Sequence, residues 1–280
     1  GPPGSGKTML AKALLSIMPS MNIDSVIEAT KIHSAAGQLS TKSPYIYSRP
    51  FRAPHHSASA IALVGGGSVP GPGEISLAHN GVLFLDELPE FPRAVLDNLR
   101  QPLESGYVTI SRARQSLDFP AQFQLIGAMN PCPCGFVTDK NIACRCLPMT
   151  IKRYQERLSG PLLDRFDLFV EVPCLEVSEL QSFKKSEPSQ DIRKRVIRVR
   201  DLQVKRDSSN NAVQQMLEPL AKQFLGQACR QLQISNRGYF RLLKVARTIA
   251  DLDGSDGVKQ QHVAEAMQYR FRGFGGKQVV

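Results

Sequence analysis

The chain begins Gly1-Pro2-Pro3-Gly4-Ser5-Gly6-Lys7-Thr8, which fits the pattern G-x-x-x-x-G-K-[ST] at every position. The glycines allow backbone N–H groups to converge on phosphate oxygens. The Lys7 ammonium adds positive charge at the β- and γ-phosphates, and the Thr8 hydroxyl can ligate Mg²⁺. The stretch therefore predicts a P-loop, and we expect its eight residues to hold ATP and Mg²⁺.

The residues that follow the P-loop fit this prediction. Residues 9–18 form a helical pattern that ends before Pro19, and the amino end of such a helix favours phosphate. A P-loop normally follows a strand at the centre of a parallel sheet, and here the sequence starts at the loop itself. We therefore expect the given sequence to be an N-terminally truncated piece of a longer protein.

Two apolar runs further along end in polar side chains. The run 82–85 is followed by Asp86 and Glu87, and the run 124–128 by Met129 and Asn130. Short apolar runs of this kind are typical of buried parallel strands. We expect Asp86 to hold Mg²⁺, Glu87 to activate the attacking water, and Asn130 to position that water against the γ-phosphate.

Arginines are candidates for stabilising the charge that develops during phosphoryl transfer. Arg165 follows a predicted helix at 151–159, and we expect it to act as an arginine finger on the nucleotide of a neighbouring subunit. Ser235 is a suitable cap for a helix whose first turn carries Arg237. Arg237 is the preferred sensor-2 residue, which contacts nucleotide from the second domain, and Arg241 is the alternative.

The sequence predicts an α/β ATPase core at residues 1–173, lacking its first strand, followed by an all-helical domain at 174–280. Strands that alternate with helices indicate a parallel sheet with helices on both faces. The segment 43–81 reads as a long loop with short elements. The remaining predicted elements are a helix at 93–101, a strand at 168–172, and helices near 189–206, 212–231, 236–251 and 259–270.

Four of the six cysteines lie close together, in a segment at 131–148 that reads as an insert in the core. They form the pairs Cys132-Pro-Cys134 and Cys144-Arg-Cys146. Four thiolates can bind Zn²⁺ in a closed tetrahedral site, although the C-x-C spacing is shorter than usual. A structural zinc site and a group of reduced thiols are the two interpretations. Cys174 and Cys229 are expected to be ordinary buried thiols.

The formal net charge of +10 favours a polyanionic partner, of which nucleic acid is the commonest. A basic surface that only aids solubility is the alternative. No run of eighteen apolar residues predicts a membrane span, and no signal-peptide pattern occurs at the start, so we expect a cytoplasmic location.

Several stretches together resemble the bacterial magnesium-chelatase-like AAA+ ATPases, specifically the ComM/YifB group. These are Arg49–His56, Pro72–Glu87, Asn130–Gly135, Gly160–Arg165 and Val245–Leu252. The resemblance covers the whole chain. It implies a AAA+ core with a helix-2 insert, a helical lid, a homohexameric ring that uses ATP and Mg²⁺, and branch migration of DNA in natural transformation. A Lon-protease-like domain precedes the ATPase in that group.

The same resemblance gives roles to two loops. Val64–Gly73 corresponds to the helix-2 insert, and a predicted hairpin at 107–119 corresponds to the pre-sensor hairpin, with Arg112 and Arg114 at its tip. In a ring both loops would face the pore, where basic side chains can follow the phosphate backbone of single-stranded or branched DNA. An exposed charged hairpin with no DNA contact is the alternative.

Three functions fit these features. The preferred one is an ATP-driven, helicase-like DNA motor. The second is a magnesium-chelatase-type ATPase that remodels a protein partner without DNA, and the basic hairpin and net charge disfavour it. The third is a scaffold whose ATP site controls assembly only, and the Asp86-Glu87 pair disfavours it.

Overall fold

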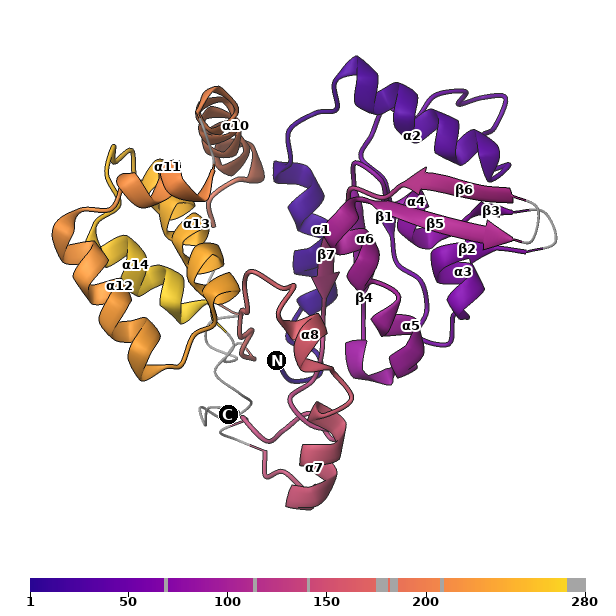
Figure 1. The fold of residues 1–280 in the computed structure, drawn as a ribbon. Coiled ribbons are helices and arrows are strands. Elements are labelled where there is room, and N and C mark those ends of the chain that lie inside the picture. Colours follow the sequence, from indigo (N-terminus) through magenta and orange to yellow (C-terminus); the bar gives the residue numbers. More distant parts are fainter. Residues whose placement is uncertain are drawn as a thin grey trace. The chain divides into compact units, whose positions relative to one another are not determined.

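The computed structural model describes residues 1–67, 70–112, 115–139, 142–174, 181, 186–206 and 209–270. The chain divides into two compact units, shown with their elements in Figure 1. The first comprises Gly1–Ser16, Ser20–Arg165 and Val172–Lys184, and the second Ile17–Pro19, Phe166–Glu171 and Lys185–Val280. Of the described helices, none combines the length and the apolar character that a membrane crossing requires.

A parallel three-stranded sheet organises the first unit, in the order β1 (Phe51–Arg52), β4 (Val82–Leu85) and β7 (Gln124–Gly127). All four residues of β4 are buried, as the apolar run predicted for a central parallel strand. The two predicted strands that end in polar residues are confirmed. The sequence did not indicate β1, because its two residues are too few for an alternating pattern.

Helices cover the sheet. The helix α1 (Lys7–Ile17) packs on it through Ala11, which clusters with Phe84 and Ala128, and Figure 1 shows α1 beside β7. The helix α2 (Ile23–Ala35), which was not predicted, is capped by Asn22, whose side chain accepts a hydrogen bond from the Ser25 N–H. The expected α/β architecture with a parallel sheet is therefore present.

The segment predicted as a long loop contains short elements: α3 (Ala60–Val64), β2 (Gly65–Gly66), β3 (Gly71–Pro72) and α4 (Glu74–Leu77). Strands β2 and β3 pair antiparallel, which gives the expected insert 64–73 the form of a small hairpin. A bidentate ion pair from Arg52 to Glu74, with N···O distances of 2.6 and 2.7 Å, ties β1 to α4.

A second hairpin confirms the prediction for 107–119. Strands β5 (Tyr107–Arg112) and β6 (Gln115–Pro120) pair over their full length. It lies against the β2–β3 hairpin, because a Cβ added at Gly65 would stand 2.9 Å from Ile110 Cδ1. The two loops that the resemblance assigns to a pore are thus neighbours within the first unit.

Several predicted boundaries were wrong. The helix expected at 93–101 is two short helices, α5 (Arg93–Asp97) and α6 (Arg100–Ser105), which follow the 3₁₀ turn η1 (Leu88–Glu90). The helix expected at 151–159 is α7 (Pro148–Gln155), and α8 (Gly160–Leu163) comes after it.

The strand expected at 168–172 is absent from the described residues. A strand requires a ladder of hydrogen bonds to a neighbour. In this stretch the Phe169 N–H donates a backbone hydrogen bond to the Tyr269 carbonyl, and Tyr269 follows a helix. The apolar pattern of residues 168–172 carries no information on whether a neighbouring strand is present.

The second unit is helical, with α10 (Ser189–Lys205), α11 (Asn210–Gln215), α12 (Pro219–Gln231), α13 (Asn236–Leu252) and α14 (Gln260–Gln268). Leu225, Leu243 and Val263 belong to its buried core. The helix predicted at 212–231 is interrupted before Pro219, because proline lacks the N–H that a continuous helix would use. Ser235 caps α13 as predicted, accepting a hydrogen bond from the Gly238 N–H.

A buried ionic network holds the last turns of α13. Asp251 accepts hydrogen bonds from Arg247 at 2.6 and 3.0 Å and from Arg206, the residue directly after α10, at 2.6 and 2.8 Å. The Arg247 and Asp251 side chains are 4% and 3% exposed. Arg247 also donates to the carbonyls of Ser255 and Asp256, so its charge is well compensated.

Asp251→Asn should destabilise the second unit by about 3–5 kcal/mol, because it leaves buried arginine charge without its counter-ion. Native-state hydrogen exchange of α13 peptides would measure the loss. The matched control is Asp201→Asn, which changes an exposed carboxylate on α10. Its free energy of unfolding should stay within about 0.5 kcal/mol of the parent value. Equal protection in the two variants would contradict a stabilising role for the network.

The network also predicts a pH dependence. Burial alone would raise the pKa of Asp251, but hydrogen bonds from Arg206 and Arg247 outweigh it and leave that pKa below its ordinary value. The contribution of Asp251 to stability is therefore complete above the ordinary pKa of about 3.9 and is lost as the pH falls through the lowered folded value. The exchange protection of α13 should weaken below that point in the parent protein and not in Asp251→Asn.

Candidate nucleotide site

The P-loop takes its predicted form because two of its glycines adopt the left-handed region, with φ of 77° at Gly4 and 84° at Gly6. Side chains other than glycine adopt such values at a cost. The helix α1 begins at Lys7, directly after the loop. Backbone N–H groups at the amino end of this helix have no partner within it and are available to phosphate oxygens.

Lys7 connects the loop to the end of β7. Its ammonium donates to the carbonyls of Gly1 and Pro2, both at 2.7 Å, and to Asn130 Oδ1 at 3.0 Å. The Gly1 nitrogen lies 3.2 Å from the Met129 carbonyl in the same region. Partial burial lowers the pKa of Lys7, an effect that the negative charge of Asp86 opposes. The ammonium is therefore partly desolvated and is suited to an anionic ligand.

The P-loop also meets the end of β4. The Thr8 hydroxyl donates to Asp86 Oδ2 at 2.8 Å, and the Glu87 N–H donates to Asp86 Oδ1 at 2.9 Å. A hydroxyl beside a carboxylate offers the hard oxygen ligands that Mg²⁺ prefers. The structure thus brings together Lys7, Thr8, Asp86, Glu87 and Asn130, whose roles in catalysis remain predictions.

Glu87 has a partner that the sequence did not reveal. Its Oε2 lies 3.0 Å from Nδ1 of His56, which follows β1, and Glu87 has a left-handed φ of 51°. The Glu87 side chain is 56% exposed, so this ion pair lies at the surface. Since β1 and β4 are parallel neighbours, only their pairing register could have indicated that His56 lies beside Glu87.

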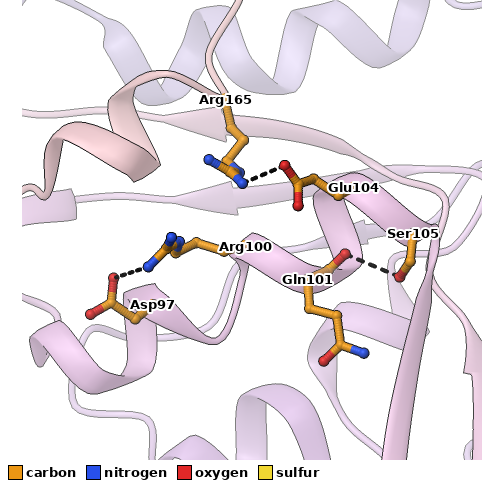
Figure 2. A pocket seen from close by; sticks show the side chains of 6 residues that line it. All are labelled: Asp97, Arg100, Gln101, Glu104, Ser105 and Arg165. Carbon is orange, nitrogen blue, oxygen red and sulfur yellow. Dashed lines mark hydrogen bonds and ion pairs between the residues drawn. The ribbon is translucent and has the colours of Figure 1, made fainter.

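Arg165, the predicted arginine finger, is held within its own unit. Figure 2 shows its guanidinium directed at Glu104, with which it forms a short ion pair, in a surface pocket that Asp97 and Arg100 also line. It also donates to the Pro161 carbonyl at 2.7 Å, and the side chain is 8% exposed. The counter-ion of Arg165 in this structure is therefore Glu104 of α6.

The sensor-2 candidates lie in the second unit. Arg237 is exposed in the first turn of α13, and Arg241 Nε lies 3.6 Å from Asp167 Oδ1. The choice between them stays a prediction. The predicted DNA-contacting Arg114 and the Arg112 side chain fall outside what the structure describes.

Cys132, Cys134, Cys144 and Cys146 converge as predicted, with their sulfur atoms all within 4.8 Å of one another. Hydrogen bonds from the backbone at Phe136 and Arg145 lower the pKa of Cys134 to about 6. The thiolate is the form of cysteine that ligates metals.

The prediction that the other two cysteines are buried was wrong for Cys174, which is exposed, with its Sγ 4.0 Å from the Pro3 carbonyl. Cys229 is partly buried against the helical core, and burial raises its pKa.

Fold and site together define a P-loop nucleotide-binding α/β core joined to a helical domain. Family models give the same result: that of magnesium chelatase subunit ChlI matches residues 1–180, and that of the ChlI C-terminal region matches residues 186–270. The chain belongs to this family of AAA+ proteins, whose members are associated with ATP and Mg²⁺.

Two bacterial relatives match 96% of the chain. Competence protein ComM of Haemophilus influenzae is 51% identical over 279 residues, and YifB of Escherichia coli is 47% identical over 279 residues. The chain spans 54% of the length of each, about half of these curated relatives. The chloroplastic magnesium-chelatase subunit ChlI of Nicotiana tabacum is 26% identical over 203 residues, 69% of this chain and 42% of that protein.

Gly6→Ala should weaken ATP binding about 5- to 30-fold, the factor that corresponds to 1–2 kcal/mol, because alanine disfavours a φ of 84°. Titration with a fluorescent ATP analogue would measure the change. The control is Gly160→Ala, where an added Cβ meets no atom within 4 Å and φ lies outside the left-handed region. If both variants bind as tightly as the parent, the P-loop conformation does not determine affinity.

Proposed function

We propose that this chain hydrolyses ATP as the motor part of a AAA+ homohexamer, at sites between neighbouring subunits. The observation that carries the proposal is the 2.8 Å hydrogen bond from Thr8 to Asp86, with Glu87 next in sequence and Lys7 at the adjoining loop. Phosphoryl transfer from a nucleoside triphosphate requires a hydroxyl on the P-loop, an acidic residue at the end of a strand and an ammonium group.

Each residue has a distinct task in this proposal. Lys7 exchanges its contacts with the loop carbonyls for phosphate oxygens, and Thr8 and Asp86 hold the Mg²⁺ that neutralises phosphate charge. Glu87 turns from His56 to accept a proton from the attacking water. Asn130 gives up its contact with Lys7 and positions that water. Glu87 and Asn130 follow neighbouring parallel strands, so they lie at the same end of the sheet.

Arg165 acts on the nucleotide of the next subunit. Within one chain its charge is satisfied by Glu104 and the Pro161 carbonyl, so assembly has to replace these contacts with phosphate oxygens. Glu104 is 48% accessible but the Arg165 side chain is only 8% exposed, so the phosphate oxygens of the neighbouring nucleotide have to offset the loss of this largely buried ion pair.

For the intact protein, we propose a helicase-like motor that moves single-stranded or branched DNA, as in branch migration during natural transformation. Three observations support it: the net charge of +10, the similarity to a protein named for competence, and the contact between the two hairpins. Adjacent hairpins in each subunit could form one continuous DNA-tracking surface around a pore.

The second candidate is a magnesium-chelatase-type motor that remodels a protein partner without DNA. The match to the ChlI family over residues 1–180 favours it, as does the similarity to the tobacco subunit. The two candidates share the ATP chemistry and differ in what stimulates it.

Forked DNA should raise the ATPase rate of the intact parent protein at low salt, and the stimulation should fall steeply at higher salt because phosphate contacts release counterions. Steady-state hydrolysis at 50 and 200 mM salt measures both effects. Glu87→Gln is the control for contaminating ATPases: it should abolish turnover and retain binding of the analogue. Hydrolysis that DNA leaves unchanged at 50 mM salt would favour the protein-remodelling candidate.

Arg165→Ala should lower turnover by about 10³-fold or more while ATP binding persists. Mixing Arg165→Ala with Glu87→Gln subunits should restore part of the activity, because some interfaces then pair an intact Glu87 with an intact Arg165. Arg157→Ala, which removes a 2.7 Å ion pair to Glu90 on the same unit, is the matched control and should retain activity. No recovery on mixing would indicate that Arg165 does not act in trans.

A further inference from the structure

The four clustered cysteines have the separations of ligands around one metal ion. Cys132 Sγ lies 3.4 Å from Cys134 Sγ and 3.8 Å from Cys144 Sγ, and the latter two sulfurs are 3.5 Å apart. Sulfurs at the corners of a tetrahedron with Zn–S bonds of about 2.3 Å are about 3.8 Å apart. The measured distances are close to that edge length.

Disulfides do not account for the arrangement. All four are free cysteines, and their separations far exceed the S–S bond length of about 2.05 Å. The three sulfur–sulfur distances given above are all short enough for a single ion to lie at the centre of the four sulfurs. Tetrahedral sulfur ligation by four cysteines is characteristic of Zn²⁺ and of iron–sulfur centres, and a closed structural site of this kind most often holds Zn²⁺.

The segment that carries the cysteines has little regular secondary structure to hold it. Its described parts, 131–139 and 142–147, contain no helix or strand, and the apolar side chains of Ile142 and Leu147 are 49% and 72% exposed. Cys132 is fully buried, whereas the other three are partly buried. A metal ion supplies the cross-links that such a segment cannot obtain from an apolar core.

The cysteine segment packs directly on the P-loop. A Cβ added at Gly135 would stand 2.3 Å from Cδ of Pro3, so only glycine permits this approach, and its φ of 86° also favours glycine. The segment starts immediately after Asn130, which accepts a hydrogen bond from Lys7. On its other side, the Pro131 carbonyl accepts a hydrogen bond from Gln155 of α7.

We propose that Cys132, Cys134, Cys144 and Cys146 bind one Zn²⁺, and that the zinc-held segment braces the P-loop through Gly135 and Pro3. Zinc binding stands independently of the proposed ATPase, whereas the bracing role rests on ATP binding at Lys7 and Thr8. Loss of the metal loosens the segment, and with it the positions of Pro3 and Asn130. The nucleotide then binds to a less ordered loop and more weakly.

The test compares the intact parent protein with Cys144→Ser and with Cys174→Ser. The second is a matched control, because Cys174 is exposed, lies near Pro3 and is outside the cluster. Elemental analysis gives metal per chain, and a fluorescent ATP analogue gives nucleotide affinity. We expect about one zinc per chain in the parent and in Cys174→Ser. Cys144→Ser should lose the metal and bind the analogue about 5- to 30-fold more weakly.

Each other outcome removes a stated part of the proposal. Zinc near zero in a parent protein with reduced thiols overturns the metal site, and iron in its place overturns the assignment to zinc. If Cys144→Ser loses its zinc but binds the ATP analogue as tightly as the parent protein does, the bracing role is overturned and the metal site stands. A parent protein that holds zinc and binds no analogue contradicts the proposed ATPase and leaves the metal site standing.

Cys144→Ser could also fail to fold, which circular dichroism would reveal. In that case a mercurial reagent removes zinc from the folded parent protein, with Cys174→Ser treated in parallel to correct for the exposed thiol. Weaker analogue binding after zinc release supports the bracing role, and unchanged binding overturns it.

Discussion

The hydrogen bond between the Thr8 hydroxyl and the Asp86 carboxylate joins segments 78 residues apart, and the geometry of the candidate site depends on it. It forms because α1 packs on the sheet through Ala11, which brings the amino end of α1 to the carboxyl end of β4. A parallel sheet gathers the ends of its strands at one edge, so Asp86 and Asn130 meet the P-loop there. Sites at this edge are common in open α/β sheets for the same reason.

The charged groups of the site are already engaged inside the chain. Lys7 is bound by loop carbonyls and Asn130, and Glu87 by His56. A ligand that recruits these groups has to replace existing contacts, so only part of its interaction energy is gained as affinity. The internal contacts also keep partly desolvated charges compensated before ligand binds. A site of this kind favours a ligand with several negative charges, since it must satisfy more than one of these groups.

Sequence reasoning was most successful where chemistry is local. The P-loop, strands β4 and β7, the β5–β6 hairpin and the convergence of the cysteines each follow from a short pattern, and each is present. It failed where an element depends on a distant partner: β1 has two residues and exists through pairing with β4, and the stretch 168–172 has an apolar pattern without a neighbouring strand. The partners of Glu87 and Arg165 were missed for the same reason, because ion pairs across 31 and 61 residues leave no local signal.

Because the cysteine segment packs on the P-loop, a metal bound in that segment also affects the order of the P-loop. A P-loop whose glycines favour no single conformation needs support from its surroundings, because a flexible loop would lose more entropy on binding phosphate. Here the loop continues directly into α1 at Lys7, and Gly135 contacts it at Pro3. Since Asn130 is followed directly by the cysteine segment, a rigid cross-link there fixes the loop and Asn130 together. Order in one short segment is thereby shared by the P-loop and Asn130, two parts of the site that are far apart in the sequence.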